Sequence, residues 1–103
     1  MTAEIVSFGL PRPHAEGVIH RLAKQNQFGM SEDSQFELKM LERGFDMRQV
    51  LETIKEGVVN QGPTKDDYGE WRCRVKRRVA GRLVRVALAI SSDLTFLTLI
   101  SVH

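Results

Sequence analysis

The feature that most constrains the fold is a change of hydrophobic period at Val58. From this residue onward, apolar residues recur at every second position, as in β-strands with one buried face. Three long strands and one short strand are predicted, over residues 68–79, 83–90, 94–102 and 58–61. The segment 62–67 reads as a loop. The short connections 80–81 and 91–93 predict an antiparallel meander, since Gly81 can supply the positive φ of a tight turn.

The first half of the chain follows a helical period instead. Three helices are predicted, over residues 13–26, 31–44 and 46–57. Pro13 suits the first position of a helix, and Ser31 is a good N-cap. Asp46 and Gln49 have the spacing of a capping box, which makes the third helix the most clearly marked of the three.

Helices followed by a meander indicate an α+β protein, because the helices must cover the apolar face of the sheet. We expect three N-terminal helices packed on one face of a three- or four-stranded antiparallel sheet. The length of 103 residues is typical of a single domain, here residues 1–103. Residues 1–12 include a short apolar run ended by prolines, and are expected to form an arm or an edge strand.

Basic residues are concentrated on one predicted hairpin, although the net charge is only +2. The segment from Arg72 to Arg85 holds seven of the 15 Lys and Arg residues and none of the 13 Asp and Glu residues. The rest of the chain is therefore acidic on balance. Charge separated in this way creates a strong local field and indicates a negatively charged partner.

Strand alternation sorts the side chains of this hairpin between two faces. One face is expected to pack beneath the helices and holds Trp71, Cys73, Val75 and Val79. The other is expected to be open and cationic, and holds Arg72, Arg74, Lys76, Arg78 and Arg85. Small residues beside the cations, Ala87 and Ala89, predict a shallow trough. Arg77 falls outside this pattern and predicts a bulge or an edge position.

Two interpretations of the open face remain. Arginine binds phosphate groups with its planar fork, so an unmixed cationic face favours an anionic partner such as a nucleic acid. Alternatively, the cations keep an exposed strand from aggregating. Lys39 and Arg43 either extend the basic surface or pair with glutamates such as Glu42.

Few other residues carry reactive groups. Tyr68 follows a polar loop and is the aromatic residue best placed for an exposed role. His103 ends the last predicted strand, and is either a general acid or base or part of a frayed end. Cys73 alternates with core residues and is expected to be buried rather than nucleophilic. No His or Cys spacing typical of metal ligands occurs, so neither a metal site nor a cofactor is expected.

Three observations concern the compartment. The chain has one cysteine, and its N-terminus has neither a basic n-region nor a long apolar run. No stretch is long enough to cross a bilayer. We therefore expect a cytoplasmic protein without a membrane partner.

Two segments resemble a small uncharacterised-domain family. They are the run Phe36-Glu37-Leu38-Lys39-Met40-Leu41-Glu42-Arg43-Gly44-Phe45 with the following Val50-Leu51, and the run from Trp71-Arg72 to Gly81-Arg82. The order of elements, with Pro13-His14 before the first helix and a tryptophan-led basic hairpin, is similar to the MqsR-type mRNA interferases. Both groups are related to the RelE/ParE toxin superfamily, as are the BrnT toxins. The resemblance covers about residues 13–102 and implies a RelE-like fold.

The resemblance implies the toxin of a toxin–antitoxin pair, an endoribonuclease that cleaves free or ribosome-bound mRNA without a metal. In such enzymes the 2′-hydroxyl attacks the adjacent phosphate, and cations stabilise the developing charge. Carried onto this chain, Lys76, Arg78 and Arg85 would stabilise the phosphate, with Tyr68 or His103 as acid or base. RNA would bind to Arg72, Arg74, Lys76, Arg78, Arg82 and Arg85.

The chain also departs from the family patterns. A histidine and an arginine of the uncharacterised family are replaced by Gln35 and Lys39. A tyrosine of the MqsR type is replaced near Val84 and Arg85. The alternative function is therefore a non-catalytic module that holds nucleic acid or an acidic protein on the same hairpin. A third interpretation is that the hairpin is an oligomer or antitoxin interface.

Overall fold

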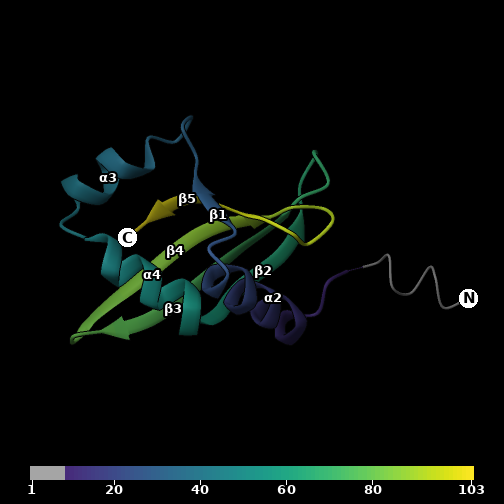
Figure 1. Ribbon diagram of the computed structural model, residues 1–103, viewed down its shortest axis with the longest axis horizontal. Coiled ribbons are helices and arrows are strands. Elements are labelled where there is room, and N and C mark those ends of the chain that lie inside the picture. Colours follow the sequence, from purple (N-terminus) through teal and green to yellow (C-terminus); the bar gives the residue numbers. More distant parts are fainter. Residues whose placement is uncertain (1–8) are drawn as a thin grey trace, which may run out of the picture.

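The computed structural model describes residues 9–103 and contains three helices and a five-stranded sheet (Figure 1). Their order is α2 (Arg12–Lys24), β1 (Phe28–Met30), α3 (Phe36–Glu42), α4 (Met47–Glu56), β2 (Val58–Lys65), β3 (Trp71–Val79), β4 (Arg82–Ile90) and β5 (Leu97–Val102). The strand order in the sheet is β1-β5-β4-β3-β2. The arm or edge strand expected at residues 1–12 lies mostly outside the described residues.

The α+β class and the three helices are confirmed, but the all-antiparallel sheet of three or four strands is wrong. β1 pairs with β5 in parallel, from Phe28 opposite Leu97 to Met30 opposite Leu99, which makes the sheet mixed. A strand of three residues is too short to display a period of two. Its pairing with a segment about seventy positions away is decided by tertiary contacts.

β2 is longer than expected, because it continues to Lys65, well into the segment 62–67 that was predicted as a loop. Its pairing with β3 shifts register between Val59 and Gln61 and again between Gln61 and Thr64. These irregularities hide the strand from a periodicity argument, since each extra residue reverses the facing of the side chains that follow.

Local signals at the third predicted helix and at the hairpin turn are confirmed. The Asp46 carboxylate accepts a hydrogen bond from the Gln49 amide N–H at 2.9 Å, and the Gln49 side chain accepts one from the Asp46 N–H at 2.9 Å. Ala80 and Gly81 both have positive φ, 52° and 81°, as a two-residue hairpin turn requires.

The start of α3 was wrongly predicted at Ser31. The backbone of Ser31 instead continues along the edge of β5, where its N–H donates to the Leu99 carbonyl at 2.8 Å. The Ser34 hydroxyl then donates to the Ile100 carbonyl at 2.7 Å, and the Arg43 guanidinium donates to the Val102 carbonyl at 2.9 Å. Residues around α3 therefore occupy the edge that β1 leaves free, which protects β5 from pairing with another chain.

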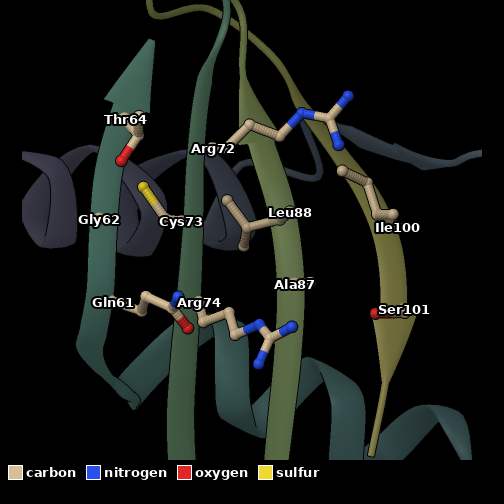
Figure 2. A pocket seen from close by; sticks show the side chains of 10 residues that line it. All are labelled: Gln61, Gly62, Thr64, Arg72, Cys73, Arg74, Ala87, Leu88, Ile100 and Ser101. Carbon is tan, nitrogen blue, oxygen red and sulfur yellow. The ribbon is translucent and has the colours of Figure 1, made fainter. Parts of the chain in front are cut away.

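The core lies between the helices and one face of the sheet. Its fully buried side chains include Ile19, Leu22, Phe36, Val50, Ile54, Val75, Val84, Val86, Leu88, Leu97 and Leu99. Figure 2 views the sheet from the opposite side, with helices behind it. In the part of the chain that the structure describes, no helix is long and apolar enough to cross a membrane.

Candidate functional site

The alternation expected along the basic hairpin is confirmed. Cys73, Val75 and Val79 are buried beneath the helices, whereas the cations between them are exposed on the other side. The two strands are in continuous register, so that Arg74 lies opposite Ala87 and Lys76 lies opposite Arg85. We call this open side the cationic face, which comprises Arg72, Arg74, Lys76, Arg78 and Arg85.

Arg77 does not mark a bulge, but it does occupy an edge position, because the pairing of β2 with β3 ends at Lys76. It is in register with Val84 and follows the alternation onto the helix side of the sheet. There its Nε lies 2.9 Å from Glu52 Oε2, and its Nη2 lies 3.6 Å from Glu56 Oε1. The hydrogen bond to Glu52 raises the pKa of Arg77. A cation can occupy this position because α4 supplies its counter-charges.

Arg82 was expected to bind RNA, but it too is on the helix side. Its guanidinium donates to the Gly44 carbonyl at 2.6 Å and to the Arg43 carbonyl at 2.8 Å. It also lies 3.8 Å from the centre of the Phe45 ring. Arg82 therefore satisfies carbonyls at the C-terminal end of α3 and is not part of the cationic face.

The cations of the face differ in how they are held. Arg72 Nε lies 3.1 Å from Asp66 Oδ2, and Arg78 donates to the Gly81 carbonyl at 3.2 Å. Burial opposes ionisation of Asp66, but hydrogen bonds from Glu70, Arg72 and Tyr68 outweigh it and lower the pKa of this carboxyl. Within residues 9–103, the side chains of Arg74, Lys76 and Arg85 form neither ion pairs nor hydrogen bonds. These three are free to bind an external anion.

His103 joins the same face. The Arg85 N–H donates to the His103 carbonyl at 2.7 Å, and the His103 N–H donates to the Arg85 carbonyl at 2.9 Å. Residues paired in this way point their side chains to the same side of a sheet. Lys76, Arg85 and His103 therefore form a row across β3, β4 and the end of β5, which we call the catalytic row because of the role that we propose for it below. Neighbouring strands of a sheet lie about 4.8 Å apart.

The surroundings of His103 favour its neutral form. Partial burial lowers the pKa of its imidazole below the ordinary value, and the positive charges of Arg74, Arg43 and Arg85 lower it further. Arg43 Nη1 lies 3.5 Å from His103 Nδ1. A neutral imidazole at pH 7 can accept a proton, as a general base must. Sequence reasoning missed this role for Arg43, because sixty positions separate the two residues and no local pattern connects them.

The structure does not bring Tyr68 to the catalytic row. Its side chain is 85% exposed at the turn between β2 and β3, where its N–H donates to Asp66 Oδ1 at 2.9 Å. Lys76 lies eight positions further along the chain, toward the opposite end of β3. Arg78 follows Lys76 on the cationic face, beside the hairpin turn.

A hollow of about 310 Å³ lies on the cationic face (Figure 2); of the two alanines expected to form a trough, Ala87 lines it and Ala89 does not. Arg72 and Arg74 flank it, and Ala87 and Ile100 lie between them on the neighbouring strands. Gln61 and Thr64 of β2 line one end, and Ser101 of β5 lines the other. In the described range 9–103, no group of three or more His, Cys, Asp or Glu side chains could hold a metal ion.

Comparison with known proteins yields one match. A family model described as a domain of unknown function (DUF4258) matches residues 36–103. The match starts at the first residue of α3 and includes the cationic face, the hollow and His103. Neither the curated proteins nor the solved structures contain a match.

Proposed function

The chain belongs to the DUF4258 family, and we propose that it binds RNA on the cationic face and cleaves it without a metal, as the toxin of a toxin–antitoxin pair. The observation that carries the proposal is the pairing of His103 with Arg85 in the catalytic row. It combines an imidazole of lowered pKa with two cations, Lys76 and Arg85, whose side chains have no partner within residues 9–103. The resemblance of the hairpin to MqsR-type and other RelE/ParE-related toxins supports the same activity.

In the proposed reaction, a neutral ring nitrogen of His103 accepts the proton of the 2′-hydroxyl. The 2′-oxygen forms a bond to the adjacent phosphorus, and the bond from phosphorus to the 5′-oxygen breaks. Arg85, between the other two side chains of the row, stabilises the charge that develops on the phosphate oxygens. The ammonium of Lys76 supplies the proton to the leaving 5′-oxygen. The products are a 2′,3′-cyclic phosphate and a 5′-hydroxyl.

A second function is favoured by the geometry of the rest of the face. Arg72, Arg74 and the hollow between them lie on the face beside the catalytic row, and they do not depend on His103 for their arrangement. A non-catalytic module would use them to bind RNA or an acidic protein. It would bind in a salt-sensitive manner and leave RNA intact.

The test is incubation of the purified chain with end-labelled single-stranded RNA, in the presence of a chelator. Wild-type protein should produce fragments ending in 2′,3′-cyclic phosphate, and His103→Gln should bind RNA equally well but lose cleavage by at least about a hundredfold. Lys76→Glu should lose both binding and cleavage. Lys24→Glu reverses an exposed cation of α2 and serves as the matched control.

The outcomes separate the two functions. Intact RNA at high protein concentration, together with salt-sensitive binding, would reject the nuclease and select the binding module. Expression of the wild-type chain should also arrest growth, and a protein encoded by the adjacent reading frame should relieve the arrest. Harmless expression would count against the toxin.

A further inference from the structure

We propose that the hollow between Arg72 and Arg74 holds one unpaired nucleobase, so that the cationic face recognises single-stranded RNA rather than duplex RNA. This inference rests on the proposed function, in that the ligand is RNA. It adds a base-binding site to a surface that otherwise contacts only phosphates. The argument depends on the spacing of the two arginines, the lining of the hollow and the ion pair of Arg72.

The spacing of Arg72 and Arg74 along β3 leaves room for one base stacked between them. They stand two residues apart on β3 and point to the same side, which separates them by about 6.8 Å along the strand. Stacked bases lie about 3.4 Å apart. One base between two guanidinium planes therefore needs a separation of about 6.8 Å between the planes, which is the separation of the two arginines along the strand. Figure 2 shows both side chains extending from β3 across β4, with the hollow between them. Arginine planes are common stacking partners for unpaired bases.

The lining of the hollow suits a base better than a phosphate. Its centre is formed by apolar atoms of Ala87 and Ile100, against which the face or edge of a ring can pack. Polar groups are confined to the ends, where Gln61, Thr64 and Ser101 offer an amide and two hydroxyls. These groups both donate and accept hydrogen bonds, as reading the edge of a base requires. In a duplex that edge is already paired.

The charge of Arg72 also points to a base. Its guanidinium forms an ion pair with Asp66 at 3.1 Å, and the Asp66 carboxylate is fixed by the N–H groups of Tyr68 and Glu70, each at 2.9 Å. A phosphate placed at Arg72 would meet this carboxylate and be repelled. The Arg72 side chain nevertheless remains 52% exposed, and the ion pair holds its guanidinium in place. Arg72 is therefore a weak phosphate ligand and a preorganised stacking surface.

On the Arg74 side, the hollow lies next to the catalytic row. Arg74 is unpaired among residues 9–103, and its charge contributes to the lowered pKa of His103. A base held between Arg72 and Arg74 would thus place its own nucleotide next to the phosphate that is cleaved. Recognition of that base would then determine where the RNA is cut.

The test compares two probes of equal charge: an eight-nucleotide single-stranded RNA and an eight-unit abasic ribose-phosphate chain, measured by fluorescence anisotropy at one salt concentration. Wild-type protein should bind the RNA at least about fivefold more tightly than the abasic chain. An RNA duplex of the same length should bind more weakly than the single strand. Ala87→Leu, which fills the hollow, should make the affinities for RNA and abasic chain equal.

Two controls keep the result interpretable. Val58→Leu adds bulk to an exposed residue opposite Lys76, outside the hollow, and should leave the preference for bases unchanged. Gln61→Ala, at an exposed position, should reduce the preference even if Ala87→Leu proves unstable in urea. Equal wild-type affinity for RNA and abasic chain would overturn the base site and leave phosphate binding standing. Absence of binding to both probes would overturn the proposed function and the base site together.

Discussion

His103 lies directly opposite Arg85 at the end of β5, joined to it by two backbone hydrogen bonds of 2.7 and 2.9 Å. This pairing places an imidazole on a face that otherwise carries cations. Partial burial and the arginines around it lower the pKa of the ring, which favours the neutral form that the proposed base requires. The proposed chemistry therefore depends on the backbone pairing of His103 with Arg85, which brings the imidazole beside the cations.

The first prediction concerns the titration of His103. Because burial and the charges of Arg74, Arg43 and Arg85 lower its pKa, its imidazole signals should titrate below the ordinary histidine value in a pH series of NMR spectra. Arg43→Ala removes one of these charges and should raise the pKa. The acid limb of RNA cleavage should move to higher pH with it, since cleavage needs the neutral form. Arg21→Ala, on the exposed side of α2, is the control, and an unchanged titration in Arg43→Ala would contradict the assignment.

The second prediction separates two arginines of the same hairpin. Arg82→Ala loses two hydrogen bonds to carbonyls near the end of α3 and should lower the free energy of unfolding by about 1–3 kcal/mol, with RNA affinity unchanged. Arg74→Ala should lower RNA affinity and leave the free energy of unfolding unchanged, because the Arg74 side chain is exposed and unpaired within residues 9–103. Urea denaturation and anisotropy on both variants measure the two effects. A loss of RNA affinity in Arg82→Ala without a loss of stability would show that Arg82 contacts RNA directly.

The third prediction concerns two glycines with nearly equal positive φ, 82° at Gly62 and 81° at Gly81. A side chain at Gly81 meets no atom within 4 Å, so Gly81→Ala should cost only the left-handed strain, about 1–2 kcal/mol. A Cβ at Gly62 would collide with the Arg72 carbonyl and lie 3.3 Å from the Cys73 Cα. Gly62→Ala should therefore cost at least about 1 kcal/mol more in urea denaturation. Equal costs would mean that β2 can move away from β3 without penalty.

The fourth prediction concerns Cys73, the only cysteine of the chain. It is 4% exposed, and burial raises the pKa of its thiol to about 11, although Arg12 lowers it slightly. The reactive thiolate is therefore scarce at neutral pH. Alkylation by iodoacetamide at pH 7.5 should be slow in the native protein and fast in urea. Cys73 also lines the hollow, so rapid alkylation of the native protein would show that the hollow opens far enough to expose the thiol.

The helices and the cationic face could be predicted because local patterns specify them. The capping box of Asp46 and Gln49 marks a helix start within four residues, and the turn at Ala80 and Gly81 sets the register of the hairpin. Once that register is set, a period of two assigns Arg72, Arg74, Lys76 and Arg78 to one side. Arg77 was not assigned to the helix side from the sequence, because its partners Glu52 and Glu56 come from a helix that no local pattern connects to it.

Other features came only from the tertiary structure. β1 is three residues long, and its parallel pairing with β5 is stabilised by contacts from a distant segment. Arg82 resembles its basic neighbours in sequence, but the carbonyl groups at the end of α3 engage it on the other side of the sheet.

The basic hairpin, its facing and its trough were thus determined by the sequence, because alternation along a strand depends only on neighbouring residues. The position of His103, the base of the proposed reaction, was decided by the fold. Burial lowers the pKa of His103, and the charges of Arg74, Arg43 and Arg85, which three separate segments bring together, lower it further. Electrostatic interactions act through space, so a charge sixty positions away along the chain can set the protonation of a side chain that it contacts.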